Sequence, residues 1–142
     1  MALLSGSQKE EIVAAIRDAE LRNRGEVRVH IERWCFVGGP MARAEALFHK
    51  LGMGATKDGT GVVLYVAARS RRAAVFAGPG VFGDAAAGQW TGVVAAVAEG
   101  YRDKAGIRGI VEAIGRIGAV LREAVPGEDE TGNELPDEVT VG

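Results

Sequence analysis

The sequence predicts an α/β protein, a three-layer α/β/α sandwich built around a small mixed sheet. Apolar residues recur at helical spacing in four segments, and three shorter runs have the composition of strands. Turns rich in Gly, Asp or Pro separate these segments. The expected order is α-β-α-β-β-α-α, and helices before, between and after three strands are typical of a sheet enclosed by helical layers.

The first helix is expected to begin at Ser7, which together with Glu10 fits a capping box, and to end near Gly25. A strand follows over residues 26–32, where apolar and polar side chains alternate. One face of this strand is apolar, formed by Val27, Val29 and Ile31. The other face is polar and carries Glu26, Arg28, His30 and Glu32.

A second helix is expected to begin near Pro40, which suits a first helical turn. The β-prone run over residues 62–67 predicts a strand covered on both faces. A hairpin at residues 69–72 leads into a third strand, residues 73–77. Two helices, residues 85–104 and 107–124, complete the fold. The last contains Gly109, Gly115 and Gly118, which are tolerable if its backbone lies close to the sheet.

Length and charge predict one domain, residues 1–126, followed by an acidic C-terminal tail, residues 127–142. Residues 128–142 hold six acidic side chains and no Lys or Arg, whereas the other 127 residues hold 17 basic and 13 acidic ones. The tail is either a solubilising segment or one that binds a partner. No signal peptide pattern and no membrane-length apolar run is present, so we expect a soluble cytoplasmic protein.

The sequence offers few groups for catalysis. A single cysteine, Cys35, excludes an intramolecular disulfide, and one Cys with His30 and His49 lacks the close spacing of a zinc site. No Ser-His-Asp combination is visible. The glycine pattern at residues 78–83 lacks the following strand of a dinucleotide-binding unit, so we interpret it as a tight connection. No catalytic residue is predicted.

Two kinds of charged residue could bind ligands. Asp58 and Asp84 lie in turns that could converge on a hard cation such as calcium, although Asp also favours turns and helix N-caps for local hydrogen bonding. Arg69, Arg71 and Arg72 form a basic patch that could bind phosphate or another anion. Nucleic-acid binding is not expected there, because no aromatic platform is interleaved.

Both tryptophans are expected to pack in the core. Trp34 closes the first strand, and Trp90 follows the glycine-rich turn on the third long helix. If Trp90 were exposed, it would be a natural interface anchor.

Several segments together resemble the TPM domain family. They are residues 25–32, 47–53, 61–67, 106–107 and 133–139, with Thr56 and Trp90. The chain is most similar to a short, soluble bacterial branch related to thylakoid-lumen proteins of photosystem II repair. The resemblance implies an α/β/α sandwich and, among relatives, acid phosphatase activity, divalent cation binding or an adaptor role. Relatives often have Asp where this chain has Gly78, and Asn where it has Thr60.

Two functions follow as hypotheses. The first is a non-enzymatic binding or adaptor module acting with a membrane-associated protein partner, with a partner-binding set formed by Trp90, Asn133, Glu134, Leu135, Pro136, Asp137 and Glu138. The alternative is a divalent-metal-dependent, acid phosphatase-like hydrolase. It would use Glu26, Asp58 and Asp84 as metal ligands and Arg69, Arg71 or Arg72 to steady phosphate.

Overall fold

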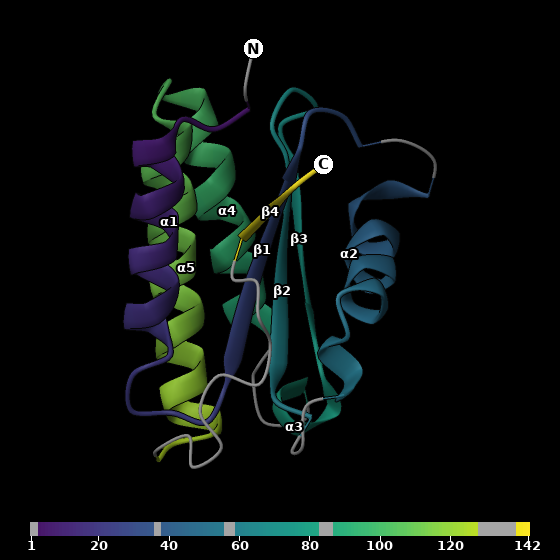
Figure 1. The fold of residues 1–142 in the computed structure, drawn as a ribbon, viewed down its shortest axis with the longest axis vertical. Coiled ribbons are helices and arrows are strands. Elements are labelled where there is room, and N and C mark those ends of the chain that lie inside the picture. The colour runs from purple at the N-terminus through teal and green to yellow at the C-terminus, as the bar shows by residue number, and fades with distance from the viewer. Residues whose placement is uncertain (1–2, 36–37, 56–58, 83–86, 128–138) are drawn as a thin grey trace.

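A computed structural model describes residues 3–35, 38–55, 59–82, 87–127 and 139–142 of the 142-residue chain. A four-stranded mixed sheet lies between two helical layers (Figure 1). Helices α1 (Gly6–Ala19), α4 (Ala87–Arg102) and α5 (Gly106–Ala124) cover one face, and α2 (Gly39–Lys50) covers the other. The predicted α/β/α sandwich is confirmed.

The strand order is β3-β2-β1-β4. Strand β1 (Glu26–Glu32) pairs in parallel with β2 (Gly61–Ala67), and β2 pairs antiparallel with β3 (Arg72–Ala77). A short β4 (Val139–Val141) pairs in parallel with the other edge of β1, with Val29 opposite Val139. The sequence predicted three strands, and β4 is a fourth, contributed by the region predicted as the acidic tail.

Two short helical turns complete the described elements, η1 (Met53–Ala55) and α3 (Pro79–Phe82). The capping box of α1 lies two residues earlier than predicted. Ser5 Oγ accepts a hydrogen bond from the Gln8 N–H at 3.1 Å, and the Gln8 side chain accepts one from the Ser5 N–H at 2.9 Å. Among the described residues, no helix has both the length and the hydropathy needed to cross a bilayer.

The main core lies between the sheet and the layer of α1, α4 and α5. The apolar face of β1 contributes Val27, Val29 and Ile31 to it, as predicted. Two smaller clusters lie under α2. One contains Ala44, Leu47, Tyr65, Ala67 and Ala74, and the other contains Phe48, Met53 and Val63. Both faces of β2 are therefore buried, as its unbroken β-prone run predicted.

Two of the three glycines named above for α5 approach neighbouring helices rather than the sheet. A Cβ atom placed on Gly109 would lie 2.8 Å from the Gly100 Cα of α4, and one on Gly118 would lie 2.9 Å from the Ala19 Cα of α1. A Cβ atom on Gly115 would meet nothing within 4 Å. Helix-to-helix contact thus accounts for two of the three glycines.

Candidate functional site

The polar face of β1 is buried. Glu26, Arg28, His30 and Glu32 expose between 2% and 8% of their surface. The alternation in the sequence therefore separates two buried faces, one apolar and one polar. Buried charged groups are costly unless they are paired, so this row must be held by specific partners.

Glu32 accepts hydrogen bonds from three side chains. Arg43 of α2 donates from Nε to Oε2 at 3.1 Å and from Nη2 to Oε1 at 3.0 Å. The Tyr65 hydroxyl of β2 donates to Oε2 at 2.5 Å, and His30 Nε2 lies 3.3 Å from Oε1. Two strands and one helix are thus joined through one carboxylate.

These bonds fix the charge of the group. Burial by itself would raise the pKa of Glu32, but the hydrogen bonds from Arg43 and Tyr65 outweigh it and lower that pKa to about 2. Burial raises the pKa of Tyr65, and the hydrogen bond that its hydroxyl donates to Glu32 raises it further. The site therefore holds an ionised carboxylate and a protonated phenol at neutral pH.

Both ring nitrogens of His30 are engaged. The Nδ1 atom lies 2.6 Å from Thr140 Oγ1 of β4, and Nε2 faces Glu32. An ionised carboxylate only accepts, so Nε2 carries the proton and Nδ1 accepts from the Thr140 hydroxyl. Burial lowers the pKa of His30 despite the neighbouring Glu32. The imidazole is neutral at pH 7, and a Cβ atom on Gly142 would lie 2.7 Å from its Nε2, which shows how closely the terminal backbone covers it.

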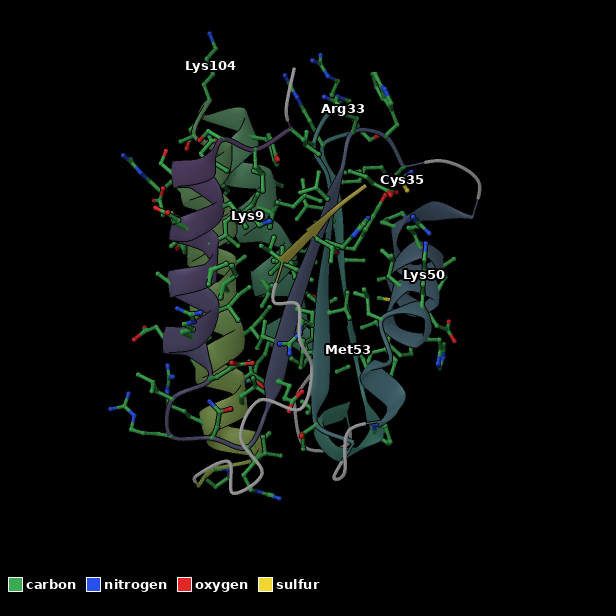
Figure 2. The ribbon with its side chains drawn as sticks, viewed as in Figure 1. Lys9, Arg33, Cys35, Lys50, Met53 and Lys104 are labelled. Atoms are coloured by element: carbon green, nitrogen blue, oxygen red, sulfur yellow. The ribbon has the colours of Figure 1, made fainter. Side chains whose placement is uncertain are left out.

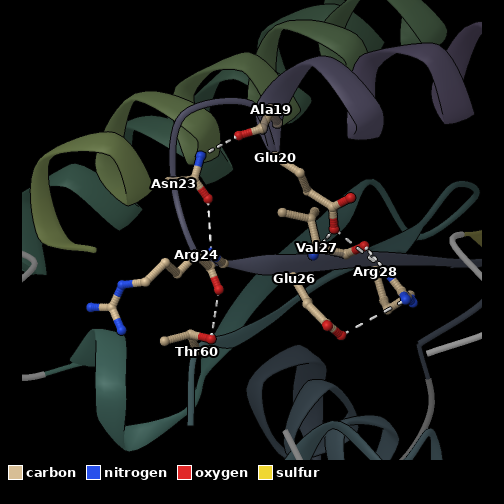
Figure 3. A network of polar contacts seen from close by, with 9 residues as sticks. Ala19, Glu20, Asn23, Arg24, Glu26, Val27, Arg28 and Thr60 are labelled. Atoms are coloured by element: carbon tan, nitrogen blue, oxygen red, sulfur yellow. Dashed lines mark hydrogen bonds and ion pairs between the residues drawn. The ribbon is translucent and has the colours of Figure 1, made fainter. Parts of the chain in front are cut away.

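Arg28 links the other half of the row to α1 (Figure 3). Its Nη1 donates to the Val27 carbonyl at 2.7 Å and lies 3.6 Å from Glu20 Oε2, while its Nη2 lies 4.0 Å from Glu26 Oε2. Glu20 Oε2 also accepts from the Val27 N–H at 2.8 Å. Arg28 thus pairs with carboxylates of its own strand and of the residue that ends α1.

Asn23 and Thr60 fix the entry to β1 (Figure 3). The Asn23 side chain donates to the Ala19 carbonyl at 2.7 Å and accepts from the Gly25 N–H at 2.9 Å. The Thr60 hydroxyl donates to the Arg24 carbonyl at 2.9 Å. Thr60 thus connects the start of β2 to the start of β1.

The turns before β2 and after β3 meet at this end of the sheet. The Gly80 N–H donates to the Gly59 carbonyl at 2.8 Å, and a Cβ atom on Gly78 would lie 2.4 Å from Gly59 O. Any side chain at position 78 would require the backbone to shift, so an aspartate does not fit there in this structure. Asp58 and Asp84, predicted as metal ligands beside these turns, lie outside the described residues.

Glu26 alone does not make a cation site. Its carboxylate faces Arg28, and a guanidinium beside it opposes the binding of a metal ion. Within the described ranges, no three His, Cys, Asp or Glu residues gather as metal ligands. The described residues by themselves therefore do not form a metal centre, and two of the three predicted ligands lie outside them.

The predicted anion-binding arginines lie at the other end of β2. Gly59 precedes that strand and Arg69 follows it. Seven strand residues at roughly 3.3 Å each span about 20 Å. Glu26, the one predicted metal ligand among the described residues, pairs with Gly61 at the start of β2, so one small substrate would not reach both it and the arginines.

Arg69 and Arg71 line a pocket of about 470 Å³, completed by Trp34, Ala68, Tyr101, Lys104 and Gly106. Arg72 and Arg71 line a smaller, adjoining pocket of about 220 Å³. The prediction that Trp34 packs in the core was wrong, because 50% of its surface is exposed. Trp90 is half-buried and packs against the main core.

Comparison with known proteins decides the family. The model of the TPM domain matches residues 1–120. The chain belongs to the TPM domain family. No curated protein matches it.

The BA42 protein of the psychrophilic bacterium Bizionia argentinensis shares this TPM fold with a TM-score of 0.87 and 29% identity, over 99% of this chain and 97% of that one. An N-terminal domain from P. gingivalis matches at a TM-score of 0.70 with 21% identity, covering 87% of this chain and 80% of that one. The N-terminal domain of cg2496 from Corynebacterium glutamicum matches at 0.65 with 13% identity, covering 84% and 74%. The last two comparisons support the fold alone.

The TPM domain contains site residues that the sequence analysis missed. Arg43 and Tyr65 join the polar row, and Tyr65 could have been noticed as the lone polar group in an aliphatic strand. Thr140 could not be predicted, because the three residues of β4 are too few to show the alternation of apolar and polar side chains that marks a strand. Asn133, Glu134, Leu135, Pro136, Asp137 and Glu138, predicted to bind a partner, lie outside the described residues.

Proposed function

We propose that this TPM domain is a cytoplasmic, non-enzymatic binding or adaptor module that acts with a membrane-associated protein partner. One contrast carries the proposal. The titratable groups of β1 are buried and bonded to one another, whereas Trp34, Arg69 and Arg71 are exposed around a pocket. Tryptophan and arginine are the residues most enriched among the energetically dominant contacts of protein interfaces.

The chemistry of the polar row supports binding over catalysis. A general base must present a lone pair to its substrate, but His30 Nδ1 already accepts from Thr140, and Glu32 already accepts from Arg43 and Tyr65. Thr140, His30 and Glu32 together have the group types of a hydrolase triad, yet the His30 side chain is only 8% exposed. The row is better suited to holding β4 and α2 on the sheet.

The tail remains the second proposed contact with the partner, through residues 133–138. Because Val139–Val141 is a strand of the sheet, deleting the whole tail would also remove β4. The sharper variant replaces only residues 133–138 with Gly and Ser and keeps residues 139–142.

The experiment that tests the module is crosslinking and affinity capture with three proteins: the unaltered chain, the 133–138 replacement and the exposed Glu45→Gln change on α2 as a charge control. We expect a reproducible membrane-fraction protein that the 133–138 replacement loses and the control retains. Capture that is unchanged in the replacement would contradict the role of the tail.

The alternative is a calcium- or magnesium-dependent, acid phosphatase-like hydrolase. The contact between Gly59 and Gly80 favours it, because it brings together the turns that adjoin Asp58 and Asp84. It predicts hydrolysis of p-nitrophenyl phosphate with added metal, lost in an Asp58→Asn, Asp84→Asn double variant. Activity in the unaltered chain above that variant would overturn the non-enzymatic proposal, and saturable amide shifts around Gly59 and Gly80 on calcium titration would establish the metal site.

A further inference from the structure

One end of the molecule concentrates positive charge. Three described segments meet there: residues 33–35, 68–72 and 101–108, which we call the basic end. They contain one acidic residue, Asp103, and seven cationic ones: Arg33, Arg69, Arg71, Arg72, Arg102, Lys104 and Arg108. Figure 2 shows Arg33 and Lys104 at this same end. The whole chain has a formal charge of −2, so a local balance of +6 is a strong asymmetry.

The 470 Å³ pocket lies within the basic end. Its cationic lining is Arg69, Arg71 and Lys104, all exposed, and its aromatic lining is Trp34 and Tyr101. Gly106, the first residue of α5, also lines it, and the positive end of that helix adds to the potential. Cationic groups bind carboxylates, and aromatic rings provide large contact area for proline or another aromatic ring.

The backbone at the pocket supports a role for the side chains. Three described non-glycine residues have positive φ: Arg22 at 63°, Arg71 at 54° and Lys104 at 59°. Two of the three line this pocket. Glycine adopts this conformation at lower cost, so a long cationic side chain at such a position is a disadvantage to the fold unless it serves another purpose.

We propose that this pocket binds an acidic peptide segment of a partner protein, one that combines Glu or Asp with an aromatic or proline residue. Carboxylates of the segment would pair with Arg69, Arg71 and Lys104, and its flat side chain would pack against Trp34. The proposal rests on the proposed binding function and specifies the chemistry of the partner. A concave pocket with aromatic lining favours a peptide over a flat lipid surface, and its size suits one or two side chains.

The test uses the random copolymer of Glu and Tyr, which presents acidic and aromatic residues in many local orders, with polyglutamate alongside. Arg71→Gly and Lys104→Gly each remove a charge at a backbone position that suits glycine, so both variants should fold. Arg22→Gly is the matched control, since it makes the same change at the third positive-φ position, in the connection between α1 and β1. Binding is followed by amide chemical shifts and by tryptophan fluorescence.

We expect saturable shifts at Trp34, Ala68 and Gly106, and tighter binding of the Glu-Tyr copolymer than of polyglutamate. Arg71→Gly and Lys104→Gly should each bind the copolymer at least about fivefold more weakly, because loss of one ion pair costs about 1 kcal/mol. Arg22→Gly should bind the copolymer as tightly as the unaltered chain does. Trp34→Ala should remove the preference for the copolymer over polyglutamate.

Three results would overturn the inference: equal weakening in all three glycine variants, shifts away from the pocket, or tighter pocket-dependent binding to phosphatidylglycerol vesicles or single-stranded DNA. The inference can also fail without the proposed function. If the copolymer does not bind but Arg71→Gly and Lys104→Gly still capture the membrane-fraction partner, the adaptor role stands and the pocket assignment falls. Metal-dependent phosphatase activity would instead remove the adaptor role itself.

Discussion

Glu32 at the end of β1 and Arg43 in α2 form a two-point ion pair, with nitrogen–oxygen distances of 3.1 and 3.0 Å. The Glu32 side chain is 11% exposed and that of Arg43 is 38% exposed, so the pair lies at the margin of the buried row. A guanidinium and a carboxylate in this geometry are more strongly and more directionally bound than a single-contact pair. The pair therefore positions α2 over the sheet.

Glu32→Gln should destabilise the fold by about 2–4 kcal/mol, because the neutral amide weakens the bonds from Arg43 and Tyr65 and leaves a partly buried guanidinium without its counter-charge. Urea unfolding followed by circular dichroism measures the loss. Glu45→Gln, an exposed change on the same helix, is the control and should stay within about 0.5 kcal/mol. Similar values for both variants would contradict the role assigned to Glu32.

Stability should fall in acid as Glu32 is protonated. Its folded-state pKa of about 2 lies below the unfolded value of 4.5, so the unfolded state binds the proton first. Ionised Glu32 therefore contributes about 3 kcal/mol to the free energy of unfolding above pH 5, and this contribution is lost as the pH falls toward 2. Burial likewise lowers the pKa of His30, so its contribution is lost as pH falls below 6.5. Unfolding free energy measured from pH 7 to pH 2 tests both, and Glu32→Gln should flatten the acid limb.

Thr140→Val should loosen β4. The change keeps the shape of the side chain but removes the donor to His30 Nδ1, at a cost of about 1–2 kcal/mol. Amide hydrogen exchange of Gly142, whose N–H donates to the Ile31 carbonyl at 3.0 Å, should accelerate about tenfold. The exposed Val141→Thr change is the control and should leave that amide protected. An unchanged Gly142 rate in Thr140→Val would show that the hydroxyl does not hold the strand.

Gly109→Ala and Gly115→Ala should have opposite effects although both lie in α5. At Gly109 the new methyl would meet the backbone of α4 at 2.8 Å, so we expect about 2–3 kcal/mol of destabilisation from forced separation of the helices. At Gly115 it would meet nothing within 4 Å, and the gain in helix propensity should stabilise by about 0.5–1 kcal/mol. Thermal unfolding of both variants measures the two changes in stability. If both substitutions stabilised or both destabilised the protein, the assigned helix contact would be refuted.

Periodicity in the sequence was enough to predict the layers of this fold. The alternation over residues 26–32 and the unbroken run over residues 62–67 correspond to β1 and β2. Local signals could not show that the polar face of β1 is buried, because its partners Arg43, Tyr65 and Thr140 come from three separate elements. Burial of a polar row is a property of the tertiary arrangement.

The binding pocket was predicted only in part. Arg69 and Arg71 were identified because they are close in sequence, whereas Lys104 and Tyr101 come from the connection between α4 and α5. Trp34, which closes the first predicted strand, was expected to pack in the core. It lies beyond the last paired residue of β1, Glu32, and 50% of its surface is exposed.

The parallel pairing of β1 with β4 has a kinetic consequence. His30 and Thr140 are 110 residues apart in the chain, whereas β1, β2 and β3 are consecutive strands with shorter separations between paired residues. Closing a long loop costs the chain more conformational entropy before any hydrogen bond forms. The β1–β2–β3 unit with its helices should therefore form first. Addition of β4 would then be a late event, and changes at Thr140 should accelerate unfolding while leaving the refolding rate almost unchanged.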